Sequence, residues 1–291
     1  MLLNDQIPRL IYFVNYTKYS ILKGENHMLS VNPFAILAET VSPIYMQSFV
    51  ILMIVLIAVG TLVDIIHKKN VKYFFENAKK AKLSAKKTLS SGEKISVISK
   101  TIVNDIATTS ELGAGKRRAA HLLGMYGTIL FWIGSVIMIF CYSTTETPSV
   151  WPIIWHCGAI MTVLGGSWFW FFLRVDVYSE AHPWYRIIKA DLFVLALVAT
   201  SLFGLIWSYL QSLSLNDRWD DKVFLVLFII SNLVLFGGVY WSKFAHMFYK
   251  PGAAIQKNLA EADGSRDNLP PEADAPEQFG KGIKRDEPKH Y

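Results

Sequence analysis

Apolar residues in this chain are gathered into five long blocks that polar stretches separate. The blocks are residues 45–66, 119–142, 151–173, 190–211 and 223–246. Each is close to the ~20 residues that an α-helix needs to cross the ~30 Å hydrocarbon core of a bilayer. The pattern therefore predicts an all-α integral membrane protein, built as a five-helix transmembrane bundle.

The distribution of lysine and arginine predicts the orientation of these helices. Residues 68–118 hold thirteen basic and four acidic residues, whereas residues 143–150 hold no basic residue. Residues 212–222 hold two basic residues and three aspartates, and residues 174–189 hold three basic residues. Because short basic loops stay in the cytoplasm, we expect a multi-pass protein of the cell membrane, with the N-terminus outside and the C-terminus in the cytoplasm.

Five parts follow along the chain. They are an extracytoplasmic segment (1–44), the first span (45–66), a basic cytoplasmic loop (67–118), the bundle of the remaining spans (119–247) and an extended cytoplasmic tail (248–291). We expect no cleavable signal peptide, because the short apolar run 10–14 lacks a small-residue cleavage pattern.

The loop and the tail both have features of interaction segments. Residues 68–87 suit a helix on anionic lipid, or simply a solvated orientation signal. Apolar residues within 95–112 have the spacing of an amphipathic helix that docks on another surface. The tail is rich in proline and in charges of both signs, which predicts an extended segment that lies along a partner.

Composition excludes several classes of protein. With 52% hydrophobic and 18% charged residues, the chain is neither a single soluble domain nor disordered throughout. The net charge of +6 lies between the apolar blocks, so no nucleic-acid partner is expected. The two cysteines, Cys141 and Cys157, have no metal-site spacing, and any iron–sulfur cluster must belong to a partner. A disulfide between them stays open.

Two histidines at the inner ends of predicted spans are the first candidates for a cofactor site. His121 lies near the inner end of block 119–142, and His246 lies near the inner end of block 223–246. Two imidazoles at one depth on facing helices suit a six-coordinate b-type haem. Interfacial histidines that reach the membrane surface are the alternative. Glycines beside them would leave room for a flat ring or serve ordinary helix packing; they are Gly124, Gly127, Gly237 and Gly238.

Two further histidines have more open roles. His156 lies a short way into the third block from the outside, where a second haem, a quinone carbonyl or a backbone carbonyl would each explain it. His67 ends the first block on the inner side and is a further candidate haem ligand.

Other residues near the membrane surface have ordinary explanations first. Asp64, Asp191, Lys189 and Lys243 suit interfacial salt bridges, while Arg117, Arg118 and Lys243 suit contacts with haem propionates. Trp151, Trp155 and Trp219 suit an aromatic belt at the outer face, with a quinone pocket near Trp155 and His156 as the alternative. Phosphate loops, nucleophile elbows and paired catalytic carboxylates are lacking, so hydrolase and kinase functions have no residues to support them.

Two stretches resemble a known family. Residues 115–127 read GKRRAAHLLGMYG, and residues 241–251 read WSKFAHMFYKP. The first resembles the entry to the second span of membrane cytochrome b subunits related to the gamma subunit of respiratory nitrate reductase. The second is similar to the end of their last span. The membrane cytochrome subunits of heterodisulfide reductase and of sulfite-reduction-associated complexes are similar in the same way.

The resemblance implies a five-helix subunit that reacts with quinol and carries haem b, with His246 as a ligand of the haem nearer the cytoplasm. It also implies a cytoplasmic iron–sulfur catalytic subunit of the heterodisulfide reductase type, which we expect to dock on residues 68–118 and 248–291. The nitrate reductase pattern has two further histidines where this chain has Phe131 and Phe228. One haem is therefore expected, and a second would need His156.

The leading hypothesis is an electron-transfer subunit that passes electrons between a membrane quinol, or a similar carrier, and that partner. The alternative is a haem-free membrane anchor that docks a cytoplasmic redox complex. A small transporter is disfavoured, because the sequence has neither an inverted repeat nor paired interruptions of its spans.

Overall fold

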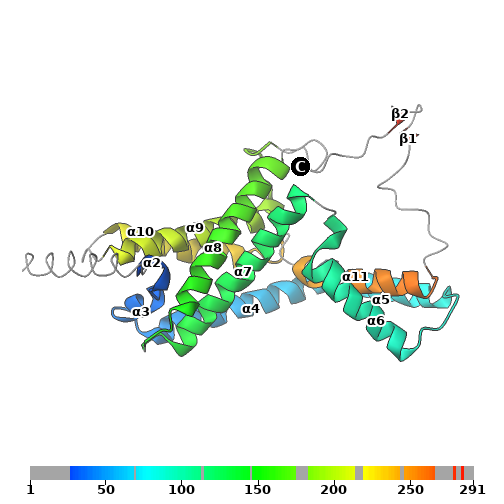
Figure 1. The fold of residues 1–291 in the computed structure, drawn as a ribbon, viewed down its shortest axis with the longest axis horizontal. Helices are drawn as coiled ribbons and strands as arrows, with labels where there is room; N and C mark the ends of the chain where they lie inside the picture. The colour runs from blue at the N-terminus through cyan, green and yellow to red at the C-terminus, as the bar shows by residue number, and fades with distance from the viewer. Residues whose placement is uncertain are drawn as a thin grey trace, which may run out of the picture. The chain divides into compact units, whose positions relative to one another are not determined.

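The computed structural model describes residues 27–68, 70–112, 115–144, 146–174, 183–213, 219–242, 246–265, 278–279 and 283–284. Figure 1 shows the order of the elements along this part of the chain. The α-helices are α2 (His27–Ser30), α3 (Pro33–Ala38), α4 (Pro43–Lys68), α5 (Asn70–Leu83), α6 (Ser91–Thr101), α7 (Lys116–Cys141), α8 (Val150–Trp168), α9 (Leu192–Ser212), α10 (Trp219–Gly237) and α11 (His246–Ala262).

Shorter elements connect or end these helices. The segments η1 (Ile102–Ala107) and η3 (Phe169–Leu173) are π-helical, and η2 (Ser110–Leu112) and η4 (Lys189–Asp191) are 3₁₀ turns. The strands β1 (Gln278–Phe279) and β2 (Ile283–Lys284) form one antiparallel pair. The described chain is therefore almost entirely helical, as the sequence predicts.

Four helices are long and apolar enough to cross a membrane. They are Pro43–His67, Lys116–Cys141, Val150–Leu173 and Lys189–Ser212. Helix α4 exposes large apolar side chains along its length, among them Ile51, Val55, Leu62 and Ile66. Contiguous exposed apolar surface of this kind suits lipid rather than water. The protein is therefore a multi-pass membrane protein.

The fifth apolar block folds differently from the prediction. Helix α10 begins with Trp219, Asp220 and Asp221 and ends at Gly237, and a turn follows over residues 238–242. Its apolar part, residues 223–237, is about 22 Å long at ~1.5 Å per residue. The predicted span of 223–246 is thus too long at its inner end, and α10 does not belong to the four helices above.

The chain divides into two compact units. One contains Met1–Ile57, Leu123–Ser167 and Leu192–Gly238, and the other contains Ala58–Leu122, Trp168–Asp191 and Val239–Tyr291. In the first unit, α7 and α8 meet at glycines. A Cβ atom on Gly127 would lie 2.6 Å from the Thr162 backbone nitrogen, and one on Gly158 would lie 2.5 Å from the Phe131 backbone nitrogen. Gly127 therefore serves helix packing, and the space it was expected to leave for a haem ring is filled.

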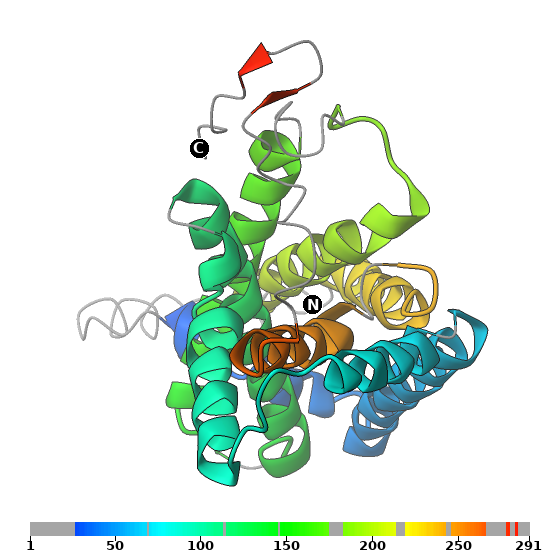
Figure 2. The same ribbon diagram turned by 90° about the vertical axis from the view of Figure 1, so that its right-hand side faces the viewer.

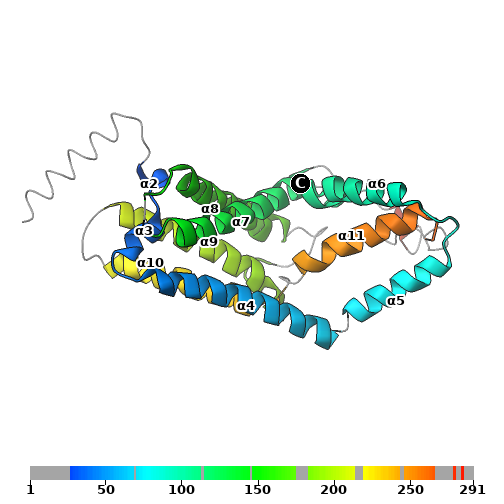
Figure 3. The ribbon, with the colours of Figure 1, turned by 90° about the horizontal axis from the view of Figure 1, so that it is seen from below.

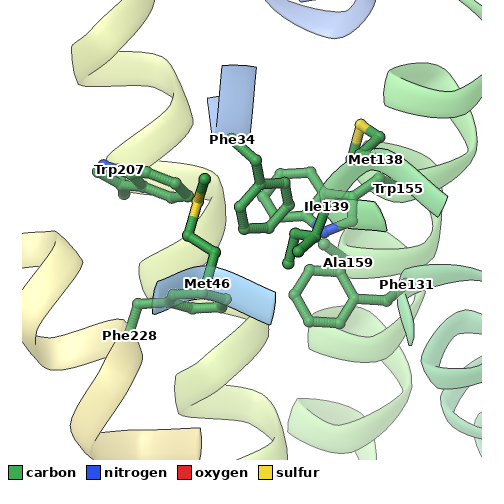
Figure 4. Packing of buried hydrophobic residues seen from close by; sticks show 9 residues of the cluster. All are labelled: Phe34, Met46, Phe131, Met138, Ile139, Trp155, Ala159, Trp207 and Phe228. Carbon is green, nitrogen blue, oxygen red and sulfur yellow. The ribbon is translucent and has the colours of Figure 1, made fainter. Parts of the chain in front are cut away.

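Aromatic rings fill the core of this unit (Figure 4). The Phe131 and Trp155 ring centroids are 5.0 Å apart, and Phe131 meets Phe228 edge to face at 6.4 Å. Trp207 stacks on Phe228 with centroids 5.8 Å apart. Such pairs add stabilisation to the burial of the rings themselves.

The described part of the N-terminal segment packs on this core. Phe34 from α3 contacts Trp155 and Trp207 edge to face, with centroids 5.8 and 5.6 Å away. The Asn32 carboxamide oxygen accepts a hydrogen bond from the Phe34 backbone nitrogen, and its Nδ2 donates to Thr147 Oγ1 at 2.9 Å. These bonds satisfy the first turn of α3 and tie it to the loop between α7 and α8.

In the second unit, α11 lies beside α5 and α6 (Figures 2 and 3). Asn258 Nδ2 donates to Thr101 Oγ1 at 2.8 Å and to Asp105 Oδ2 at 2.6 Å. The backbone nitrogens of Lys86 and Lys87 donate to the Asp263 carbonyl at 2.9 and 3.2 Å. These contacts join the basic loop to the start of the tail.

The prediction of an extended tail over 248–291 is therefore wrong for residues 248–262, which belong to α11. Apolar residues at 254, 255, 259 and 262 fall on one helical face, and they gain a partner when α11 packs on the loop. The amphipathic segment expected within 95–112 docks on the chain's own tail. Apart from β1 and β2, the tail after 265 lies outside the described residues.

The glycine contact between α7 and α8 gives a test of this packing. We expect Gly158→Ala to destabilise the protein by about 1–3 kcal/mol, because its new methyl group would collide with backbone. Gly124→Ala on α7 is the matched control, because a Cβ there meets nothing within 4 Å. Thermal unfolding in detergent measures both, and equal midpoints for the two variants would contradict the packing.

Candidate functional site

His156 is buried within the first unit, and both of its ring nitrogens have partners. Nδ1 lies 2.7 Å from the Pro152 carbonyl oxygen, and Nε2 lies 2.8 Å from Ser208 Oγ. A carbonyl only accepts, so Nδ1 carries the proton and Nε2 accepts from the Ser208 hydroxyl. Of the roles left open for His156, the geometry matches the bond to a backbone carbonyl.

The space around His156 is closed as well. The Trp155 ring packs edge to face on the His156 ring, with centroids 4.8 Å apart, and Trp155 is fully buried. Its indole Nε1 donates to Ser135 Oγ at 2.8 Å. Trp155 is therefore a core residue rather than part of an aromatic belt, whereas Trp219 is 76% exposed and suits a belt.

Phe131 and Phe228 also lie in this core. They occupy the positions where the nitrate reductase pattern has histidine. Phe131 is 1% exposed and Phe228 is 8% exposed, and their rings are in edge-to-face contact. A haem between them would have to displace the rings of Trp155 and Trp207. The residues around Phe131 and Phe228 do not fit a second haem.

His121 has a different environment from His156. It lies on the second turn of α7 and its side chain is exposed. Gly124 follows one turn later on the same face, where a Cβ atom would meet nothing within 4 Å. Arg118, one turn before, donates from Nε to the Thr108 carbonyl at 2.7 Å. This stretch of α7 has the exposed residue His121 one turn from the open Cβ position of Gly124.

His246 is the first residue of α11, and the structure describes its backbone only. The sequence prediction placed it at the inner end of the last apolar helix, but α10 ends before the turn at 238–242. Lys243 lies outside the described residues. The end of helix α10 at Gly237, followed by the turn over residues 238–242, is the physical reason for the difference.

His67 ends the first span and packs on that turn. Its exposed ring contacts the Tyr240 ring edge to face, with centroids 5.8 Å apart. A Cβ atom on Gly60 would lie 2.8 Å from the Val239 Cβ. The inner end of α4 is thus fitted closely to residues 239–240.

Asp64 is buried on the same stretch of α4, with 1% of its surface exposed. Burial raises the pKa of Tyr249 on α11, and the nearby Asp64 carboxylate raises it further. Tyr249 therefore stays neutral across the physiological pH range.

A buried ion pair joins the residue that follows the third candidate span to the start of the fourth. Arg174, fully buried, donates from Nη2 to Asp191 Oδ2 and to the Arg186 carbonyl. Its Nη1 donates to the Pro183 carbonyl at 3.0 Å, and its guanidinium carbon lies 4.2 Å from the centre of the Trp170 ring. Sequence reasoning expected Asp191 in a salt bridge but did not identify Arg174 as its partner.

The helices of the basic loop, α5 and α6, present both basic and apolar side chains to solvent. On α5, Phe75 is 64% exposed between Lys72 and Lys79, and Leu83 at its end is 84% exposed. On α6, Ile95 is 65% exposed. These residues form one face of the second unit, which the sequence predicts to be cytoplasmic.

The two cysteines, Cys141 and Cys157, are both free thiols.

Searches for family models, curated proteins and solved structures similar to this chain find no match.

The buried ion pair predicts that removing the charge of Asp191 costs much more stability than removing the charge of nearby Lys189. Asp191→Asn leaves the Arg174 charge buried without its counterion, and we expect a loss of about 3–5 kcal/mol in stability. Lys189→Gln, two residues away and exposed, should change stability little. Unfolding of the detergent-solubilised variants measures the difference, and a stable Asp191→Asn protein would refute the assignment.

Proposed function

We propose that the chain is a membrane cytochrome b subunit that carries one haem b. It transfers electrons between a membrane quinol, or a similar lipid-soluble carrier, and a cytoplasmic iron–sulfur subunit. His121 and His246 would hold the haem iron in this proposal. The observation that carries it is the exposed imidazole of His121 on a membrane-spanning helix, with open helix surface at Gly124 one turn away.

The inner and outer halves of the protein differ in their fit to haem. The inner position offers the exposed residue His121 and the open Cβ position of Gly124. The outer position offers only His156, inside a packed aromatic core that leaves no room for a macrocycle. This packed core supports one haem rather than two.

The residues of this chain would have distinct roles around the group. His121 and His246 would hold the iron through ring nitrogens, and Gly124 would let the flat ring approach α7. Arg117 is exposed on the first turn of α7 and can pair with a carboxylate. The haem itself supplies reversible one-electron transfer.

A fifth span is part of the proposal. Helix α10 packs along α9, and it exposes Val226, Ile230 and Val234 on its other side. Exposed apolar residues on a helix that is otherwise buried against a membrane span suit contact with lipid. With α10 inserted, the N-terminus lies outside and the basic loop and tail share the cytoplasm.

The cytoplasmic face favours a partner protein. Its lysines match an acidic surface, and Phe75, Leu83 and Ile95 provide apolar anchors of the kind that interfaces bury. The same face supports the second candidate function, a haem-free anchor for a cytoplasmic redox complex. The two functions differ in whether the chain binds haem.

The deciding experiment is a reduced-minus-oxidised optical spectrum with haem quantified per chain. We expect about one haem b per wild-type chain, and loss of the α band in His121→Ala and His246→Ala. His156→Asn should keep its haem, because both nitrogens of His156 serve the fold. Gly124→Leu should lower haem content, because it fills the open Cβ position on α7, and the unfolding midpoint of the haem-free protein should not fall.

Two results would contradict the cytochrome proposal or its ligand assignment. Haem retained in both His121→Ala and His246→Ala would refute the ligand assignment. If the wild-type chain binds no haem even when produced with its partner subunits, the anchor function replaces the cytochrome function.

A further inference from the structure

A layer of buried polar side chains crosses the first unit near the middle of its long helices. Each side chain lies on a membrane-spanning helix or on α10, and each is less than 9% exposed. We call it the polar layer, and its members are Thr128, Thr162, Thr200, Ser201, Ser231 and Asn232. Polar residues at such depth in a membrane protein are costly and usually have a function.

Contacts between neighbouring helices place these residues at one level. Thr128 Oγ1 and Thr162 Oγ1 are 3.4 Å apart across α7 and α8. A Cβ atom on Gly204 of α9 would lie 3.2 Å from the Phe228 ring of α10. Helices α9 and α10 run antiparallel. One turn back from Gly204 toward the start of α9, residues 200 and 201 are therefore level with residues 232 and 231 of α10.

The third helix pair has a matching register. A Cβ atom on Gly166 of α8 would lie 2.4 Å from the Val198 side chain of α9. These helices are also antiparallel, so Thr162 lies within about one turn of Thr200 and Ser201. Four helices therefore contribute to the polar layer.

Three hydroxyl groups of the polar layer already donate hydrogen bonds to backbone carbonyl oxygens of their own helices. Thr128 donates to the Gly124 carbonyl at 2.7 Å, and Thr162 donates to the Gly158 carbonyl at 2.9 Å. Ser231 donates to the Phe228 carbonyl at 2.9 Å. Their oxygen lone pairs remain available as acceptors.

The two hydroxyl groups on α9 are different. Thr200 and Ser201 are both fully buried, and among the described residues neither hydroxyl oxygen has a hydrogen-bond partner. Buried polar groups are nearly always paired, and an orphan of this kind points to a ligand or an ordered water. Two donors without acceptors thus lie level with hydroxyl oxygens that have spare lone pairs.

We propose that the polar layer is a water-binding site in the middle of the bundle. A water molecule accepts the hydrogen bonds of Thr200 and Ser201 and donates its own two protons to layer oxygens such as Thr162 Oγ1. Buried waters typically make about three such bonds. The site is independent of haem.

X-ray hydroxyl-radical footprinting in H₂¹⁸O tests the proposal on the full chain in detergent. Water bound in the layer produces radicals in place, so Leu197 on the next turn of α9 should be oxidised although it is only 8% exposed. Met138 in the aromatic core is fully buried and serves as the dry reference, after correction for its higher reactivity. Labelling of Leu197 no greater than that of Met138 would overturn the proposal.

Isosteric variants give a second measurement. In Thr200→Val/Ser201→Ala, we expect the labelling of Leu197 to fall to the reference level. We also expect the unfolding midpoint to drop by about 2–4 °C, because the water loses its donors. Ser231→Ala is the control, since the proton of its hydroxyl is bonded within its own helix. If the double variant keeps the label or has a raised midpoint, the hydroxyls bind no water.

Discussion

The close approach of α7 and α8 is the contact on which the rest of the bundle depends. Gly127 and Gly158 let the two backbones meet, because any side chain at either position would overlap with main-chain atoms. This approach places Phe131 and Trp155 ring against ring. Trp207 and Phe228 then complete a core with no space for a flat cofactor, and Phe34 packs against its tryptophans.

The aromatic core of the first unit is therefore a packed structural element. His156 illustrates the point, since its imidazole serves as a hydrogen-bonded bridge between Pro152 and Ser208. The second unit differs because its parts of α4, α7 and α11 carry ionisable residues. Asp64, His67, His121 and His246 all belong to the second unit, as does the buried pair of Arg174 and Asp191.

The basic loop has two sides with different roles. One side binds the chain's own helix α11, through Asn258 and the backbone of Lys86 and Lys87. The other side leaves Phe75, Leu83 and Ile95 in solvent beside lysines. In the proposed complex, a partner subunit would therefore bind a surface that is already folded. Binding would cost less conformational entropy than if the loop became ordered only on contact.

The membrane class, the four long apolar helices and the helical basic loop all follow from the amino-acid sequence, because length and local composition control these features. The sequence also indicated that Asp191 pairs with a cation. The fold was needed to find that Phe131 and Phe228 belong to one packed aromatic core, that Gly127 serves packing while Gly124 stays open, and that residues 246–262 form a docked helix. It likewise revealed Arg174 as the partner of Asp191, and the buried hydroxyls of Thr200 and Ser201. Each of these depends on neighbours distant in the chain, and residue spacing along one helix carries no information about which side chain the next helix presents.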